Sequence, residues 1–410
     1  MFTYPDSVRF LYELGNEIKT AKLGLERIRI VLAALGDPQR SFRVVHVAGT
    51  NGKGSTCAMI EAGLRAAGVR TGLFTSPHLI EPTERIQAAG VPVTPEQFRQ
   101  AFGVVHTTAE QCDLDCHPTY FETVTAMAFW LFRELRIETA VVEVGLGGRL
   151  DATNVVEPVL TVITPIDFDH EVYLGHTLEA IAGEKAGILK QGVPAVFAKQ
   201  RPEADAVLSA RAEELEVPVV RAEQFCVEGL EIDARGSRFN GLVCPLAGEH
   251  QVQNAVTAVL ALQTLGISPQ GIAEARWPGR LEHVAPNPDI ILDGAHNPAG
   301  ARALQRYLER FYSGRRLWLI FGAMRDKAVE EVTGILFPMA GELIFPTMNS
   351  SRALRPEALV ELAGRGRVAA DISGALAILR EAAKDEDISD DVVVITGSLF
   401  LVGEARAHLR

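Results

Sequence analysis

The residues best suited to chemistry lie at positions 46–56, HVAGTNGKGST, where small residues, one lysine and two hydroxyls follow a β-branched run. A strand, a turn and a helix in this order present backbone N–H groups and a helix N-terminus to an anion. Three glycines let the backbone approach a phosphate: Gly49, Gly52 and Gly54. Lys53 can neutralise phosphate oxygens, and Ser55 or Thr56 can bind Mg²⁺. The stretch predicts a nucleoside triphosphate site, and the alternative is a glycine-rich turn that binds nothing.

The loop departs from the common pattern G-x-x-x-x-G-K-[ST]. Val47 stands where that pattern has its first glycine, and Gly54 lies between Lys53 and Ser55. The residues alone therefore predict a bound nucleotide without saying what the nucleotide does.

The composition excludes several classes of protein. The 410 residues are 47% hydrophobic and carry a formal net charge of −12, which argues against nucleic-acid binding but allows anionic small molecules. Five scattered cysteines and a mixed N-terminal sequence favour a cytoplasmic protein without a signal peptide, and no apolar run approaches the ~20 residues of a membrane span. A zinc site at Cys112, Cys116 and His117 would lack a second pair of ligands, so a surface loop is predicted there.

Apolar strands alternate with helices over the first two thirds of the chain. Strands are predicted at 43–48, 69–74, 139–145 and 159–165, and helices from the loop to about 67, at 120–136, 177–189 and about 250–265. Strands that are apolar on both faces indicate a mostly parallel sheet with flanking helices. We predict an α/β domain of the P-loop type over residues 1–284.

A second domain is predicted after residues 283–289, HVAPNPD, because two prolines and an asparagine favour a linker. Strand and helix alternation restarts at 289–294 and continues to a strand at 392–397 and a last helix. This pattern predicts a smaller, Rossmann-like α/β domain at 285–410.

The inserted glycine of GTNGKGS is similar to the phosphate loop of the Mur ligase superfamily of ATP-dependent amide-forming enzymes. Further stretches resemble the folylpolyglutamate synthase/dihydrofolate synthase family: FTSPHL (74–79), VEVGLGGRLDATN (142–154), EKAGI (184–188), WPGRLE (277–282), LDGAHNP (292–298) and ITGSLFLVGE (395–404). The resemblance covers about residues 20 to 405. LGLERI (23–28) is also similar and is expected to border the substrate site.

The resemblance implies an ATP site and a metal site. The ATP contacts would be Gly49, Thr50, Asn51, Gly52, Lys53, Gly54, Ser55, Asn254, Arg280 and Asp293. The Mg²⁺ ligands would be Ser55, Ser76, Glu143 and His170, and K⁺ or another monovalent cation could also bind. Other readings stay open, because Glu143 could interact with a helix dipole or pair with Arg149, and His170 could be a loop histidine bonded to the backbone. Asp167 and Asp169 also compete as ligands. Asn254 could be a surface or capping residue, and Arg280 could form a salt bridge in the linker.

Lys185 lies among small apolar residues in a predicted helix. The resemblance implies that its amine is carbamylated, which would turn it into a carboxylate able to bind Mg²⁺. Burial lowers the pKa of a lysine and favours the neutral amine that this reaction needs. The alternatives are a plain phosphate contact, an exposed lysine, or an ion pair with Glu184.

The remaining implied residues concern catalysis and the other substrates. Catalysis would involve Lys53, His170 and Lys185. The pterin would contact Arg85, Phe121 and Asp151, although Phe121 could simply belong to the core and Asp151 could make a local turn contact. Ser398 would bind the incoming glutamate, and His296 would bind the glutamate or, as an alternative, the ATP.

The function implied by the resemblance is an ATP-dependent ligase that adds L-glutamate to dihydropteroate and to reduced folates through an acyl phosphate. The alternatives are a folylpolyglutamate synthase alone, another amide ligase of the superfamily, or a nucleotide-driven switch without ligase chemistry. The implied partners are ATP, L-glutamate, dihydropteroate and tetrahydrofolates, with no nucleic acid or membrane. The protein is expected to be a cytoplasmic monomer.

Overall fold

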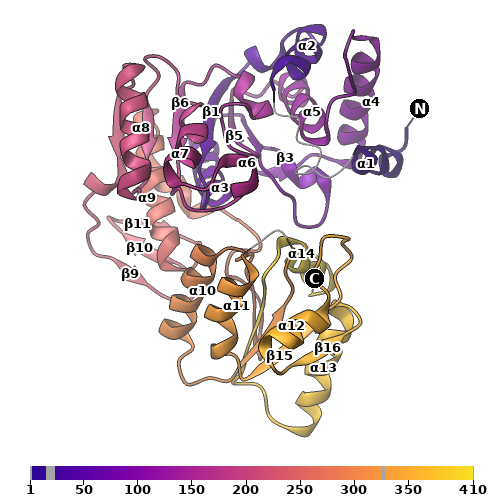
Figure 1. Cartoon of the computed structure of the whole chain (residues 1–410). Coiled ribbons are helices and arrows are strands. Elements are labelled where there is room, and N and C mark those ends of the chain that lie inside the picture. Colours follow the sequence, from indigo (N-terminus) through magenta and orange to yellow (C-terminus); the bar gives the residue numbers. More distant parts are fainter. Residues whose placement is uncertain (1, 15–23, 326–327, 410) are drawn as a thin grey trace. The chain divides into compact units, whose positions relative to one another are not determined.

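The computed structural model describes residues 2–14, 24–325 and 328–409. It divides into two compact units, Met1–Val227 with Gln253–Ala275 and Glu228–Val252 with Arg276–Arg410. Each unit has its own large sheet, and the elements are labelled in Figure 1.

The large sheet of unit 1 has the strand order β4-β3-β2-β5-β1-β6-β7-β8. Its strands are β1 (Arg43–Ala48), β2 (Thr71–Phe74), β3 (Ile86–Ala88), β4 (Val91–Pro92), β5 (Thr139–Glu143), β6 (Leu160–Ile163), β7 (Ala195–Phe197) and β8 (Val219–Arg221). The strands from β2 through β5, β1, β6 and β7 to β8 are parallel, whereas β3 is antiparallel to β2 and β4. The four strands predicted in this region are confirmed as β1, β2, β5 and β6. These four strands are neighbours in the middle of the sheet, and the loops that follow their carboxyl ends carry the candidate site.

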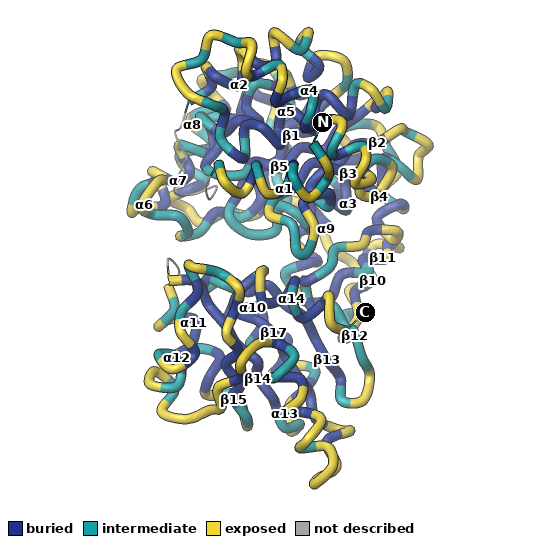
Figure 2. The backbone as a smooth tube through the Cα atoms, turned by 90° about the vertical axis from the view of Figure 1, so that its right-hand side faces the viewer, coloured by how far each residue is buried: buried dark blue, intermediate teal, exposed yellow. Residues whose placement is uncertain are grey.

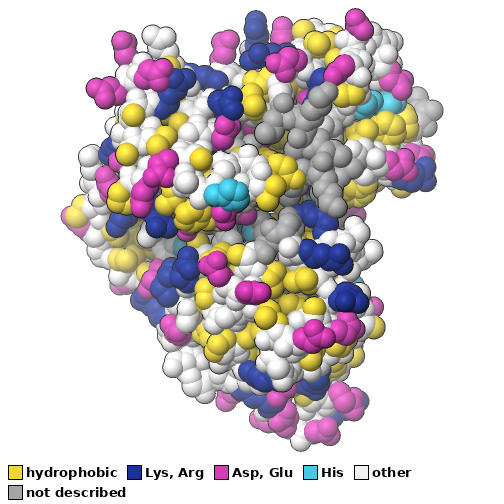
Figure 3. Space-filling view, viewed as in Figure 1, with side chains coloured by type: hydrophobic (Ala, Val, Ile, Leu, Met, Phe, Trp, Pro, Cys, Tyr) yellow, Lys and Arg dark blue, Asp and Glu magenta, His cyan; other side chains and the backbone are white. Residues whose placement is uncertain are grey.

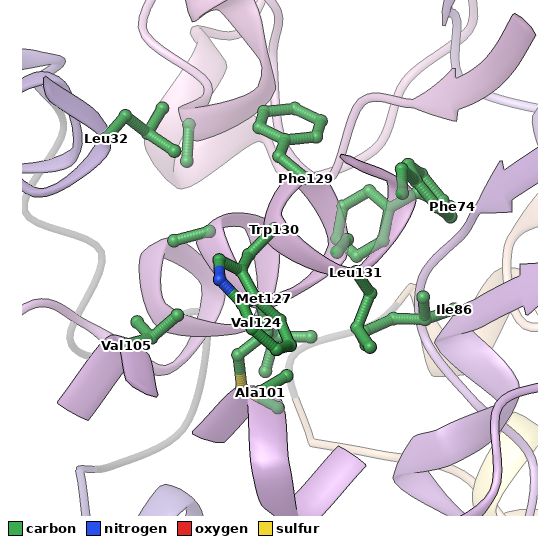
Figure 4. Packing of buried hydrophobic residues seen from close by; sticks show 14 of the residues in the cluster. Leu32, Phe74, Ile86, Ala101, Val105, Val124, Met127, Phe129, Trp130 and Leu131 are labelled. Atoms are coloured by element: carbon green, nitrogen blue, oxygen red, sulfur yellow. The ribbon is translucent and has the colours of Figure 1, made fainter. Parts of the chain in front are cut away.

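Helices of unit 1 cover this sheet and bury apolar clusters against it. They are α1 (Tyr4–Glu13), α2 (Glu26–Ala34), α3 (Lys53–Ala66), α4 (Pro95–Gln111), α5 (Tyr120–Glu134), α6 (Glu171–Leu174), α7 (Leu178–Ala186), α8 (Pro202–Glu214) and most of α9 (Glu249–Thr264). Figure 4 shows Val124, Met127 and Leu131 of α5 packed among side chains of α4, β2 and β3. Phe132 of the same helix contacts Gly72 of β2 so closely that a Cβ there would lie 2.8 Å from the ring.

Unit 2 contains two sheets. The smaller one is antiparallel, in the order β11-β10-β9, with β9 (Glu231–Ile232), β10 (Ser237–Phe239) and β11 (Leu242–Cys244). The larger one has the order β12-β13-β17-β14-β15-β16, with β12 (Glu282–Pro286), β13 (Asp289–Leu292), β14 (Leu317–Phe321), β15 (Glu342–Pro346), β16 (Arg367–Ala369) and β17 (Val392–Thr396). Only β12 is antiparallel to its neighbour. The helices are α10 (Pro298–Phe311), α11 (Val329–Leu336), α12 (Pro356–Ala363), α13 (Ile372–Asp385) and α14 (Leu399–Leu409).

The predicted linker at 283–289 is wrong. Residues 282–292 form the β12–β13 hairpin, with Asn287 and Pro288 in its turn. Pro286 is tolerated because β12 is an edge strand, where a missing backbone donor leaves no sheet partner unsatisfied. The two prolines therefore mark an edge strand and its turn.

The predicted α/β class, with a mostly parallel sheet and a smaller second α/β domain, is confirmed. The division into units differs from the predicted boundary after residue 284, since residues 228–252 and 276–284 group with the C-terminal part.

Figure 2 shows the central strands of both large sheets as buried. On the face in Figure 3, acidic and basic side chains are interspersed. Within the described ranges, none of the helices combines the length and the apolar composition that crossing a bilayer requires.

Candidate active site

The phosphate loop connects the central strand β1 to the N-terminus of α3. Gly49 and Gly52 have φ angles of 150° and 82°, which side chains rarely allow. Neighbouring side chains also leave no room for a Cβ atom at either glycine. A Cβ at Gly49 would lie 1.9 Å from Oγ1 of Thr164, and one at Gly52 would lie 2.2 Å from Oδ1 of Asn254. Packing as well as dihedral angle therefore requires glycine at both positions.

Hydrogen bonds fix the loop to the segment after β6. The backbone N–H groups of Thr50 and Asn51 donate to the carbonyl of Pro165, at 3.0 and 3.1 Å. The Thr50 hydroxyl donates to the carbonyl of Asp167 at 3.0 Å and accepts from the Asp167 N–H at 3.1 Å. Lys53 donates from Nζ to the Thr50 carbonyl at 3.2 Å. The loop is thus preformed, and Gly54 and Ser55 lie in the first turn of α3, whose N–H groups suit an anion.

Glu143 ends β5 beside the phosphate loop, opposite Val47 in the register of β1. Its Oε2 accepts from the Ser76 N–H at 3.2 Å, so two predicted metal ligands are neighbours. The alternative that Glu143 pairs with Arg149 is not what the structure shows, because Arg149 pairs with Glu184 at 2.8 Å. Glu143 is only 4% exposed, and both it and Lys53 act electrostatically on the nearby Cys57 thiol, whose pKa is raised mainly by burial.

Lys185 is buried on α7, with 4% of its surface exposed. Burial, followed by the positive charge of Lys53, lowers the pKa of its amine to about 7. The negative charges of Asp169, Asp151 and Glu184 oppose this shift. A large share of the neutral amine at neutral pH follows, and the reading as an exposed lysine is wrong.

His170 is partly exposed and is the N-cap of α6, where its backbone has the left-handed conformation with a φ of 53°. Its Nε2 lies 3.9 Å from Oδ2 of Asp169. Among the described residues, no cluster of three or more His, Cys, Asp or Glu side chains is arranged to hold a metal ion. A Mg²⁺ ion here would therefore depend on Glu143, hydroxyl oxygens and ligand phosphates, which is how Mg²⁺ commonly binds with nucleotides.

Three predicted pterin contacts have different surroundings. Arg85 is buried, donates from Nε to Nδ1 of His78 at 2.8 Å and lies over the ring of Tyr120. Phe121 is partly exposed and covers Gly145, where a Cβ would lie 2.5 Å from its ring.

The Asp151 carboxylate accepts from the N–H groups of Leu146 and Thr153, at 2.8 and 3.0 Å, so it makes the local contacts that formed the alternative reading. Burial raises the pKa of Asp151. Leu23 lies outside the described residues, and Arg27 of the same LGLERI stretch forms a buried ion pair with Glu122 at 3.1 Å.

The predicted residues of unit 2 gather at the carboxyl ends of β13 and β17. Asp293 is buried and accepts from the N–H groups of Leu281 and Ala295, both at 3.0 Å, and burial raises the pKa of its carboxyl. Arg280 and His296 act on Asp293 electrostatically, and a Cβ at Gly294 would lie 2.1 Å from the Arg280 guanidinium. Ser398 is buried, precedes α14 and accepts from the Phe400 N–H at 3.2 Å. The structure thus brings these residues of unit 2 together. Asn254, another predicted ATP contact, belongs to unit 1 and lies against Gly52 of the phosphate loop.

Two family models match the chain. The Mur ligase middle domain matches residues 47–262, and the Mur ligase glutamate ligase domain matches residues 279–399. The dihydrofolate synthase/folylpolyglutamate synthase of Bacillus subtilis is 36% identical and covers 100% of both chains. That of Mycobacterium tuberculosis is 36% identical, over 93% of this chain and 89% of the relative. The chain belongs to the folylpolyglutamate synthase/dihydrofolate synthase family of Mur ligases.

Solved structures of this family have the same fold. M. tuberculosis folylpolyglutamate synthase complexed with ADP and AMPPCP superposes with a TM-score of 0.89, at 35% identity, over 98% of this chain and 99% of the other. E. coli FolC in complex with DHPP and ADP has a TM-score of 0.87, at 31% identity, over 100% and 98% of the chains. The resemblance stated from the motifs is confirmed.

His78 lies in the FTSPHL stretch, but no role was predicted for it. Arg85 donates to its Nδ1, so its Nε2 carries the proton and can donate to the Tyr12 hydroxyl 3.2 Å away. Burial, then the charge of Arg85, lowers the pKa of His78 well below its usual value. The sequence spacing of seven residues does not predict a contact between His78 and Arg85, because only the fold of the intervening turn brings the two side chains together.

We predict that Gly49→Ala weakens ATP binding by about 10- to 100-fold, since a shifted loop loses a hydrogen bond to a charged phosphate, which contributes about 1.5–3 kcal/mol. The new methyl group would lie 1.9 Å from Thr164 Oγ1, so the loop must shift. Calorimetric titration with ATP and MgCl₂ measures the effect. Gly103→Ala is the matched control, because nothing lies within 4 Å of that position on α4. Wild-type affinity in Gly49→Ala would contradict this reading of the loop.

Proposed function

We propose that this chain is an ATP-dependent ligase that adds L-glutamate to dihydropteroate and to reduced folates through an acyl phosphate. The observation that carries the proposal is the joint placement of the phosphate loop, the Ser76–Glu143 pair and the buried Lys185 at one edge of a Mur ligase sheet. Relatives from B. subtilis, M. tuberculosis and E. coli are named for both activities. A relative from Lacticaseibacillus casei is named folylpolyglutamate synthase, so synthesis of polyglutamates alone is the second candidate.

The reaction joins a carboxylate to an amine, and the carboxylate oxygen is a poor leaving group. Attack of the folate carboxylate on the γ-phosphorus of ATP releases ADP and forms an acyl phosphate. The α-amino group of glutamate then attacks the acyl carbon, phosphate leaves, and the amine loses a proton. Lys53 and the N-terminus of α3 would stabilise the charge on the transferred phosphoryl group.

Mg²⁺ is the proposed cofactor, and the donors present suit it. The Glu143 carboxylate accepts from the Ser76 backbone N–H, and Ser55 lies in the first turn of α3, so these residues offer the hard oxygen donors that Mg²⁺ prefers. Bound Mg²⁺ would neutralise phosphate oxygens during transfer. We retain His170 as a further ligand, and K⁺ or another monovalent cation as an optional one. An ordinary loop role for His170, paired with Asp169, is the alternative.

Carbamylation of Lys185 is part of the proposal. A neutral amine attacks CO₂ and loses one proton, which gives a carbamate with one negative charge. Such a group removes the repulsion between Lys185 and Lys53, which itself lowers the pKa of the amine. It also adds a carboxylate-like donor to the carboxylates already around Lys185, which are Asp151, Asp169 and Glu184.

We assign the residues of unit 2 to the nucleoside and the amino acid. Asp293 and Arg280 would bind ATP, and His296 and Ser398 would bind glutamate. The Asp293 oxygens already accept from two backbone N–H groups, so this carboxylate also shapes its own loop. In unit 1, Asn254 would contact ATP, and Arg85, Phe121 and Asp151 would bind or border the pterin. A monomeric state and a cytoplasmic location remain predictions from the sequence.

The function is tested by product mass. The purified chain is incubated with ATP, MgCl₂ and L-glutamate, together with 7,8-dihydropteroate, a tetrahydrofolate or neither. We expect both pterins to gain one glutamyl unit per phosphate released. Gain on tetrahydrofolate alone supports the second candidate, and phosphate release without gain on either pterin contradicts the proposal and favours a nucleotide switch.

Carbamylation is expected to depend on pH. Because the Lys185 pKa is about 7, the amine is mostly neutral above pH 7 and is progressively protonated below it. At constant dissolved ¹³CO₂, the carbamate resonance in carbon-13 NMR should therefore fall as the pH drops from 8 to 6. It should vanish in Lys185→Met and persist in Lys199→Met, which removes an exposed lysine. A resonance that survives in Lys185→Met, or none in the wild type at any pH, counts against the assignment.

A further inference from the structure

The loop at 145–154, GLGGRLDATN, lies against the C-terminal end of α7, the helix that carries Lys185. The Arg149 N–H donates to the Glu184 carbonyl at 2.8 Å, and its guanidinium pairs with the Glu184 carboxylate at 2.8 Å. The Asn154 amide donates to the carbonyl of Gly187, the C-cap of α7, at 3.1 Å. Contacts of three kinds therefore join the loop to residues 184–187.

Two glycines bring the backbones into direct contact on either side of Lys185. A Cβ at Gly148 would lie 2.6 Å from the Glu184 carbonyl oxygen and 3.0 Å from Cα of Lys185. A Cβ at Gly187 would lie 2.3 Å from Cβ of Arg149. Because both gaps are too small for a side chain, the position of the loop determines where the main chain of Lys185 lies.

The same loop is fixed to the central strands on its other side. It begins two residues after Glu143, and Asp151 holds the Leu146 and Thr153 N–H groups. The Thr153 hydroxyl donates to Asp151, so Nε2 of the buried His46 on β1 donates to that hydroxyl at 2.8 Å. The loop thus links the strand that ends at Glu143 with the helix that carries Lys185.

The Asn154 side chain contacts both its own loop and the end of α7. It is buried, and its Nδ2 donates to the Arg149 carbonyl at 2.9 Å as well as to Gly187. Its Oδ1 accepts from Nζ of Lys190 at 2.8 Å. One amide therefore closes the loop on itself and attaches it to the end of α7.

We propose that Asn154 is a positioning residue for the ligase reaction, holding the GLGGRLDATN loop against α7 so that Lys185 is fixed relative to Glu143. This inference rests on the proposed roles of Lys185 and Glu143 at the phosphates. Asn154 touches neither substrate nor metal in this account, and it acts through the backbone carbonyls of Arg149 and Gly187.

Asn154→Asp tests the inference with the smallest change of shape, because a carboxylate oxygen replaces the donating amide and faces two carbonyls. We expect kcat to fall by about 10²-fold, the order expected for a misplacement of ~1 Å. The Mg²⁺ concentration for half-maximal rate should rise, whereas KM for dihydropteroate should stay within about twofold of the wild type. If Asn154 had only a structural role, KM for dihydropteroate would change together with kcat and the Mg²⁺ dependence.

Lys190→Met is the matched control. It removes the third hydrogen bond of Asn154 but leaves both donor bonds in place, so its kcat and Mg²⁺ dependence should match the wild type. Wild-type kinetics in Asn154→Asp, or an equal loss in both variants, would overturn the inference. If the wild type forms no glutamylated product, the proposed function fails instead. Calorimetry with ATP and MgCl₂ then decides the inference, since an unchanged dissociation constant in Asn154→Asp overturns it and a weakened one supports it.

Discussion

The burial of the Lys185 amine beside Lys53 is the constraint on which the site of unit 1 depends. Burial disfavours the charged ammonium, the positive charge of Lys53 disfavours it further, and the pKa of Lys185 falls to about 7. The Lys185 amine can serve the reaction only if its surroundings keep it in place while it gains or loses charge. The close contacts of α7 with the GLGGRLDATN loop supply that rigidity, and an anionic ligand or a carbamate relieves the repulsion.

Rigid backbone also explains the form of the anion site. The phosphate loop is held by the carbonyls of Pro165 and Asp167 and by close contacts at Gly49 and Gly52, so little of it needs to rearrange around a phosphate. Donors that are already oriented stabilise a developing charge without the cost of reorganisation. The loops after β1, β5 and β6 thus form one connected support at the carboxyl edge of the sheet.

Much of the fold could be predicted because it depends on local patterns. The apolar runs of β1, β5 and β6 and the glycine-rich turn before α3 identify the sheet and its anion site directly. The β12–β13 hairpin was missed because prolines suit a linker and an edge strand equally well. The contacts of Gly148 with Lys185 and of Arg85 with His78 were not predictable, since they depend on how distant segments pack. Asp151 differs, because its carboxylate binds backbone groups of its own loop, and such a local contact was one of the alternatives stated from the sequence.

The central claim is that the site activates a carboxylate by phosphorylation, and isotope transfer tests it most directly. Dihydropteroate labelled with ¹⁸O in its carboxylate is converted with ATP, MgCl₂ and glutamate, and the released phosphate is analysed by mass spectrometry. Acyl phosphate formation predicts one ¹⁸O atom in the phosphate for each glutamylated product. Unlabelled phosphate alongside normal product formation would contradict the account.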